Sequence, residues 1–221
     1  TRLPPTGDRA QRAIRLAVAA AVLLVAACGS PREAPLPAGS VVLVVGDSIT
    51  AGFGVDAGEA WPSRIAQRTG WRVVAAGVNG ERTAGGRARL PELVDEHRPA
   101  LVLIETPSNP LLRVIDIRGV TDQAKAAGTK VAVDNTFLSP ALQQPLLLGA
   151  DIVIHSTTKY INGHSDVVGG AVIAKTQELF ERLKYWANCL GLTASPFDAY
   201  LTLRGLRTLK ARLNLHLANT K

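Results

Sequence analysis

Apolar residues in this chain form short unbroken runs, separated by stretches in which apolar positions recur at helical spacing. Uninterrupted apolar runs are typical of strands that are buried on both faces. They predict strands at residues 41–45, 71–76, 101–105, 130–135, 151–155 and 169–174. The helical spacing predicts helices at residues 59–68, 115–127, 142–148 and 198–217.

The alternation of strands and helices predicts an α/β fold, with a three-layer parallel sheet and helices on both faces. Residues 169–174 would be an added strand of that sheet. Ligands collect at the carboxyl ends of the strands in such sheets. The run at 101–105 ends at Glu105 and continues into a Pro-bounded polar loop that contains Asn109. We therefore expect chemistry at this edge.

The composition allows a folded core. Of the 221 residues, 47% are hydrophobic and 19% are charged, which fits one good core or two small ones and excludes a chain that is disordered throughout. The two cysteines, Cys28 and Cys189, lie far apart in different contexts. We therefore predict neither a disulfide framework nor a metal site.

The net charge of +7 raises the question of a nucleic-acid partner. Basic residues gather on the last predicted helix, residues 198–217, in the order Arg204, Arg207, Lys210 and Arg212. No aromatic residues are interleaved with them, and no nucleic-acid-binding motif is recognised. We interpret this series as a solvated helix face and expect no nucleic-acid partner.

The first residues are typical of an export signal. Three arginines precede an apolar run at 16–27, which closes with Val25-Ala26-Ala27-Cys28 and is too short to span a bilayer. This order resembles the lipobox of bacterial lipoproteins, and that resemblance implies acylation of Cys28 and membrane anchoring in the periplasm or another extracytoplasmic space. We predict a signal segment at 1–28 and a Pro-rich linker at 29–40. The alternative is a buried Ala-rich helix.

The strand at 41–45 runs into Gly46-Asp47-Ser48-Ile49-Thr50, a turn that would place a serine hydroxyl above the sheet. Residues 41–105 resemble the SGNH (GDSL-type) hydrolases, in their arylesterase and lysophospholipase branch. The resemblance implies a flavodoxin-like front half and an ester substrate. It implies Ser48 as the nucleophile, and oxyanion donors at Ser48, Gly80 and Asn109.

This half lacks the general base that a serine nucleophile needs. The family takes its base from an Asp-x-x-His block, and none of the four histidines has an aspartate three residues before it. The loop at 106–110 also lacks the glycines of the family's Gly-x-Asn-Asp block, although Asn109 keeps the Asn position. One sequence pattern therefore ends and another begins at residues 101–105, which we call the seam.

Beyond the seam, two strand ends carry residues suited to a pyridine aldehyde cofactor. The run at 130–135 ends with Asp134, and the run at 151–155 leads into Ser156, Thr158 and Lys159. A lysine can form a Schiff base, a carboxylate can keep a ring nitrogen protonated, and hydroxyls can bind a phosphate. Taken singly, each would more often be a solvated or helix-capping side chain.

Together, Val133-Asp134-Asn135-Thr136-Phe137 and Ser156-Thr157-Thr158-Lys159-Tyr160 place residues 101–221 close to a known family. They resemble the Cys/Met-metabolism PLP-dependent enzymes, of the cystathionine γ-synthase type. The resemblance implies the large domain of a type I PLP-dependent transferase, with pyridoxal 5'-phosphate (PLP) as cofactor. Lys159 would be the Schiff-base lysine and proton shuttle.

The other roles that the resemblance implies concern the cofactor's ring and phosphate. Asp134 would pair with the pyridine nitrogen, Ser156 and Thr158 would hold the phosphate, and Asn109 would lie near the ring hydroxyl. It also implies an amino-acid substrate, a homo-oligomer and a cytoplasmic location. The family's Gly-containing phosphate loop, ring-stacking Tyr and substrate-gripping Arg have no counterpart in this sequence.

Three interpretations stay open at this point. The chain is a transsulfuration-type PLP protein, a lipid-anchored esterase that uses Ser48, or a non-catalytic hybrid in which neither pattern is complete. Both families share a strand of the type seen at 101–105, so the hybrid would arise by joining at that strand. We rank the PLP interpretation first because nearly all of its cofactor residues are present.

Overall fold

The computed structural model describes residues 36–46, 50–80, 83–109 and 112–220. The fold described below is that of the compact unit Ala38–Lys221. Cys28 and Ser48 lie outside the described residues, so the predicted acylation site and the predicted nucleophile stay predictions. No helix among the described residues is both long enough and apolar enough to cross a membrane.

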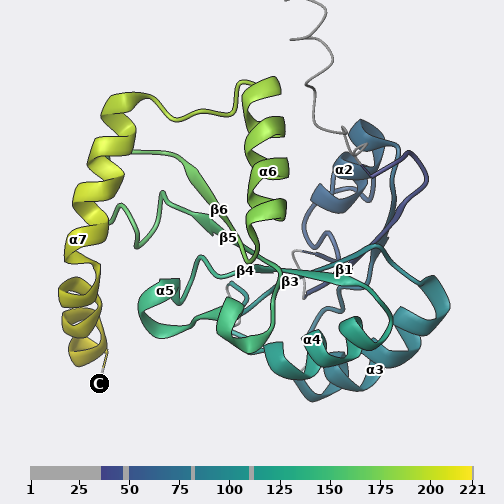
Figure 1. The fold of residues 1–221 in the computed structure, drawn as a ribbon. Helices are drawn as coiled ribbons and strands as arrows, with labels where there is room; N and C mark the ends of the chain where they lie inside the picture. The colour runs from purple at the N-terminus through teal and green to yellow at the C-terminus, as the bar shows by residue number, and fades with distance from the viewer. Residues whose placement is uncertain (1–35, 47–49, 81–82, 110–111, 221) are drawn as a thin grey trace, which may run out of the picture. The chain divides into compact units, whose positions relative to one another are not determined.

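The unit is built on one six-stranded sheet with the order β2-β1-β3-β4-β5-β6 (Figure 1). Neighbouring strands from β2 to β5 are parallel, and β6 is antiparallel to β5. Their bounds are β1 Val41–Val45, β2 Arg72–Ala75, β3 Leu101–Glu105, β4 Lys130–Asp134, β5 Ile152–Ser156 and β6 Gly170–Ala174. All six coincide with predicted strands to within one or two residues.

The direction of β6 corrects the prediction of a wholly parallel sheet. A parallel neighbour requires the chain to cross back over the sheet, usually through a helix. Residues 157–169, between β5 and β6, form turns and irregular backbone instead of a helix. The chain therefore returns antiparallel to β5, and the sheet is mixed.

Helices cover both faces of the sheet. In Figure 1, α2 and α6 lie above the sheet as drawn, α3 and α4 lie below it, and α7 stands at one side. Their bounds are α2 Trp61–Thr69, α3 Thr83–His97, α4 Ile117–Ala126, α5 Ser139–Leu142, α6 Gln177–Cys189 and α7 Pro196–Asn219. This arrangement confirms the predicted α/β class with helices on both faces.

Two helices are absent from the prediction, and one predicted helix is divided. Helix α3 contains glycines and Pro91, which are poor helix formers. Helix α6 is also not among the helices that the sequence predicts. The helix expected at 142–148 is not continuous: only Leu142 belongs to α5, which begins at Ser139, and a separate 3-10 turn spans Pro145–Leu148. Pro145 divides it because proline lacks an N–H and disfavours a helical residue before it.

The core lies against the central strands, which fixes the strand ends that carry the site. Leu43, Val102, Ile104, Val131 and Val133 are fully buried, and they come from β1, β3 and β4. Leu90 and Val94 of α3 and Val120 and Ala124 of α4 pack against them, together with further apolar residues. The edge strands β2 and β6 are more exposed along their length.

Candidate functional site

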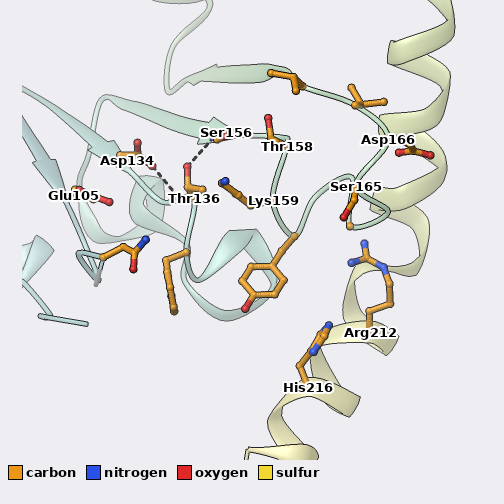
Figure 2. A pocket seen from close by; sticks show the side chains of 16 residues that line it. Glu105, Asp134, Thr136, Ser156, Thr158, Lys159, Ser165, Asp166, Arg212 and His216 are labelled. Carbon is orange, nitrogen blue, oxygen red and sulfur yellow. Dashed lines mark hydrogen bonds between the residues drawn. The ribbon is translucent and has the colours of Figure 1, made fainter. Parts of the chain in front are cut away.

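An open cavity of about 890 Å³ lies beyond the carboxyl ends of β3, β4 and β5. This is the edge at which ligands bind in α/β sheets. Its wall contains Glu105 and Asn109 from the end of β3, Asp134, Thr136 and Phe137 from the end of β4, Ser156, Thr158, Lys159 and Tyr160 from the end of β5, Gly163 and residues 165–168, and Arg212 and His216 of α7. Figure 2 shows these side chains around one space.

The structure brings together all five residues that the PLP resemblance singled out. Asn109, Asp134, Ser156, Thr158 and Lys159 all line this cavity. Their three strands are neighbours in the sheet, in the order β3-β4-β5, so residues far apart in sequence meet at one edge. The adjacency follows from the parallel pairing of these strands, which the apolar runs predicted.

Asp134 is oriented by a short hydrogen-bonded network. Its Oδ1 accepts from the Thr136 backbone N–H at 2.9 Å, and Thr136 Oγ1 accepts from the Ser156 backbone N–H at 2.7 Å. Figure 2 draws both bonds. The network ties the end of β4 to the end of β5. The Asp134 carboxylate and the Thr136 hydroxyl are therefore each held by a backbone N–H.

Thr158 closes the turn after β5 against the start of the last strand. Its Oγ1 accepts from the Gly169 N–H at 3.0 Å and lies 3.4 Å from the Gly169 carbonyl oxygen, to which it can donate. Thr157 N–H donates to the same carbonyl at 2.9 Å. Because the Thr158 bond to the Gly169 carbonyl is long, the hydroxyl proton can turn toward a ligand in the cavity.

Lys159 is exposed and lies on the turn after β5. No hydrogen bond or ion pair of its ammonium group is found among the described residues. Its carbonyl oxygen is held by the Gly163 N–H at 2.8 Å. The backbone of Lys159 is thus fixed, while its amine is available to a ligand.

Aromatic rings form one wall of the cavity. Phe137 and Tyr160 meet edge to face with ring centroids 6.3 Å apart, and Tyr160 meets His216 in the same way at 5.8 Å. Such T-shaped pairs are favourable because the positive edge of one ring faces the negative face of the other. This wall could shield a planar ring that lies between Lys159 and Asp134.

The loop that carries Asn109 is anchored from below. Thr106, which is fully buried, accepts from the Ile115 N–H through Oγ1 at 2.8 Å, and its carbonyl accepts from Gln143 Nε2 at 2.9 Å. Gln143 Nε2 also donates to Asn135 Oδ1 at 2.9 Å. Asn109 itself is exposed at the cavity edge.

His155, behind the site on β5, is a buried titratable group. Burial lowers its pKa from the ordinary 6.5, because an imidazolium loses hydration there, and the nearby Asp134 carboxylate and the main chain of Asn135 act in the opposite direction. Its Nδ1 has no hydrogen-bond partner among the described residues. The structure therefore favours a neutral His155 at neutral pH.

Several wall residues received no predicted role. Thr136 and Phe137 come two and three residues after Asp134. A hydrophobic pattern does not assign a function to the residues that follow a strand. Arg212 and His216 stand four apart on one helix, a spacing that places them on the same face of α7. That spacing was the available signal, but the sequence does not say which face of α7 meets the sheet.

Gly80, the predicted second oxyanion donor, lies in a turn with a φ of 78°. It does not line the cavity described above. A smaller cavity of about 250 Å³ adjoins the ends of β1, β3 and β4 and shares Glu105 and Asp134 with the first; Gly80 does not line it either. The role of Gly80 as an oxyanion donor therefore stays a prediction.

The cavity presents a lysine, a carboxylate and hydroxyls at neighbouring strand ends. This set is typical of proteins that bind an aldehyde cofactor with a phosphate group. The family described as Cys/Met metabolism PLP-dependent enzyme matches residues 78–221. The chain belongs to that family. Its cofactor is PLP, and the donor groups around the cavity fit that molecule's ring, aldehyde and phosphate.

Curated relatives agree with this assignment. The chain is 52% identical over 157 residues to cystathionine γ-synthase of Escherichia coli (strain K12). This alignment covers 71% of this chain and 39% of that protein. It is 55% identical over 119 residues to cystathionine γ-lyase of Dictyostelium discoideum, and this alignment covers 54% of this chain and 31% of that protein. The chain thus spans well under half the length of these relatives.

A solved structure extends the similarity into the front half of the sheet. Cystathionine γ-synthase from Xanthomonas oryzae pv. oryzae, in complex with aminoacrylate and cysteine, aligns with a TM-score of 0.66 and 50% identity, over 80% of this chain and 42% of that one. Coverage of this extent cannot be confined to residues 101–221. The family match likewise begins at residue 78, and the comparisons give no support to a hydrolase portion.

Proposed function

We propose that this chain carries the cofactor-binding part of a cystathionine γ-synthase or γ-lyase type active site, in which an amino acid undergoes elimination or replacement at Cβ or Cγ. The observation that supports it most is the gathering of Asn109, Asp134, Ser156, Thr158 and Lys159 around one cavity at the carboxyl edge of the sheet. The relatives are named for reactions of this type.

In this proposal each residue meets a different part of the cofactor. Lys159 Nζ would hold the aldehyde carbon covalently, with loss of water, and Asp134 would pair with the ring nitrogen. Ser156 and Thr158 would donate to the phosphate, and Asn109 would lie near the ring hydroxyl. When bound, PLP supplies an electron sink for the charge that develops at the substrate's Cα.

Lys159 also has the role of moving protons. After the substrate's amino group has replaced it at the cofactor's aldehyde carbon, the freed Lys159 Nζ would take the proton from the substrate's Cα and return it further along the side chain, because a single flexible amine can reach both positions. This role requires that no carboxylate hold the ammonium in a fixed ion pair. Among the described residues no such pair is present.

Asp134 supplies the negative charge that the ring nitrogen needs. A carboxylate opposite a ring N–H⁺ favours the protonated ring, which is the form that withdraws electrons most strongly. The Thr136 N–H occupies Oδ1 at 2.9 Å and so fixes the direction of the carboxylate. The second carboxylate oxygen is then the one available to the ring.

The substrate proposal is tested by release of a thiol from L-cystathionine in the presence of PLP. We expect the chain to exceed the rate of free PLP, and Lys159→Ala to return to that rate. Lys175→Ala is the matched control, because Lys175 is exposed beyond the end of β6 and does not line the cavity. A rate equal to that of free PLP would contradict the proposal.

The hydrolase prediction for residues 41–105 depends on Ser48, which lies outside the described residues. No observation on the described residues favours an esterase, so no second function is proposed. Hydrolysis of a p-nitrophenyl ester that is lost in Ser48→Ala would revive that interpretation. Acylation of Cys28 and a homo-oligomer likewise stay predictions.

A further inference from the structure

Helix α7 contacts the loop that carries Lys159 at an unusually close distance, and Gly205 is the point of closest approach. A Cβ built on Gly205 would overlap the Asn162 carbonyl oxygen and lie 2.7 Å from the Ile161 carbonyl oxygen. Both neighbours are backbone atoms, which cannot rotate away as a side chain can. Only glycine therefore allows α7 to approach this loop as observed.

Arg212, on the same side of α7, bridges the helix and the loop. Its Nη2 donates to the Gly205 carbonyl at 2.8 Å and to the Ile161 carbonyl at 3.3 Å, and its Nε donates to Thr208 Oγ1 at 3.1 Å. The planar guanidinium can make these bonds together because its donors point in fixed directions. Figure 2 shows Arg212 reaching from α7 toward this loop.

The guanidinium also covers Gly163, where a Cβ would overlap Arg212 Nη1. Gly163 has a φ of 72°, a conformation that suits glycine. Its N–H donates to the Lys159 carbonyl oxygen at 2.8 Å, and the Asn162 N–H donates to the Thr157 carbonyl oxygen at 2.9 Å. These two bonds form the turn on which Lys159 stands.

A second contact secures the far side of the loop. Asn162 Nδ2 donates to Asp166 Oδ1 at 2.7 Å, and Arg204 Nη2 lies 3.5 Å from Asp166 Oδ2. The Asn162 hydrogen bond and the nearby Arg204 hold the pKa of Asp166 below its ordinary value. This pair is partly exposed, so its contribution is small beside the Arg212 contacts.

We propose that Arg212 is a positioning residue for Lys159, and that Gly205 permits the contact through which it acts. Arg212 holds the Ile161 carbonyl and packs over Gly163, the Gly163 N–H holds the Lys159 carbonyl, and the direction of the lysine side chain follows. The inference rests on the proposed function only for the role of Lys159. Arg212 acts on the conformation of the loop, because its Nη2 donates to the Ile161 and Gly205 carbonyls.

The direct test is amide hydrogen exchange of the apo chain, followed by PLP titration. In Arg212→Met we expect amides of residues 157–163 to exchange about tenfold faster, because hydrogen bonds to a charged donor are lost, while the strands keep their protection. Arg212→Lys should restore part of the protection, because one ammonium group cannot make all the hydrogen bonds of the planar guanidinium. Gly205→Ala should loosen the same peptide.

Arg207→Met is the matched control, because Arg207 is an exposed arginine of the same helix that does not line the cavity. In PLP titration, Arg212→Met should bind several-fold more weakly than Arg207→Met. Unchanged exchange at 157–163 in Arg212→Met, or equal loss of protection across the sheet, would overturn the inference. Failure of the wild type to bind PLP would instead contradict the proposed function, while the exchange result still decides the role of Arg212.

Discussion

The backbone N–H of Thr136 donates to Oδ1 of Asp134 at 2.9 Å. Residue 134 ends β4, and the bond folds the chain back over the carboxylate directly after the strand. The side chain that we assign to the cofactor's ring nitrogen is therefore oriented by its own loop. Charge and orientation at this position can be separated by mutation, because asparagine retains Oδ1 as an acceptor.

Asp134→Asn should keep the turn and lose the charge. An amide cannot stabilise a protonated ring nitrogen, so we expect PLP to bind about ten- to a hundredfold more weakly, as measured by fluorescence titration. Asp151→Asn is the control, because Asp151 also accepts from a backbone N–H, that of Val131 at 2.9 Å, but lies at the start of β5. Equal affinity of the two variants would refute the role of Asp134.

Thr136→Val should destabilise the link between β4 and β5. Valine has the shape of threonine but leaves the Ser156 N–H without its acceptor, which now lies at 2.7 Å. We expect a loss of about 1 kcal/mol in the free energy of unfolding, measured by urea denaturation. Thr136→Ser keeps the hydroxyl and should lose less. If serine and valine cost the same, the hydrogen bond is not what stabilises this link.

His155 should make the stability of the chain depend on pH. Burial lowers its folded-state pKa below the ordinary 6.5, so below that pH the unfolded chain binds more protons than the folded one. The contribution is fully present above pH 6.5 and is lost as the pH falls toward the lowered pKa. Urea denaturation between neutral and mildly acidic pH measures it.

His155→Gln should flatten that pH dependence, because glutamine does not titrate. The comparison is made as the difference between the two chains at each pH, so that the other histidines cancel. An identical pH dependence in both chains would show that His155 does not contribute.

Much of the sheet could be predicted because its strands are uninterrupted apolar runs that begin and end abruptly. Ligands bind at the carboxyl ends of parallel strands, and neighbouring parallel strands end at the same edge of the sheet. Asp134 and Lys159, which follow neighbouring strands, accordingly line one cavity. The direction of β6 could not be predicted from its own residues. It depends on whether the preceding segment crosses the sheet, and residues 157–169 carry no signal for that choice.

The contribution of α7 shows a different limit. Helical spacing predicted residues 198–217 as a helix, and the structure has Pro196–Asn219. The series of basic residues suggested a solvated face, which is wrong for Arg212, because its guanidinium contacts Ile161, 51 residues away. A contact at that separation depends on how the elements pack, and helical periodicity carries no information on it.

The central claim is that Lys159 binds PLP in a preformed site, and absorbance titration of the purified chain with PLP tests it most directly. We predict a new visible band that borohydride reduces, with the added mass located on the peptide that contains Lys159. Lys159→Ala should show neither the band nor the added mass, and Lys175→Ala should show both. A wild-type chain that forms no band dependent on Lys159 would contradict the account.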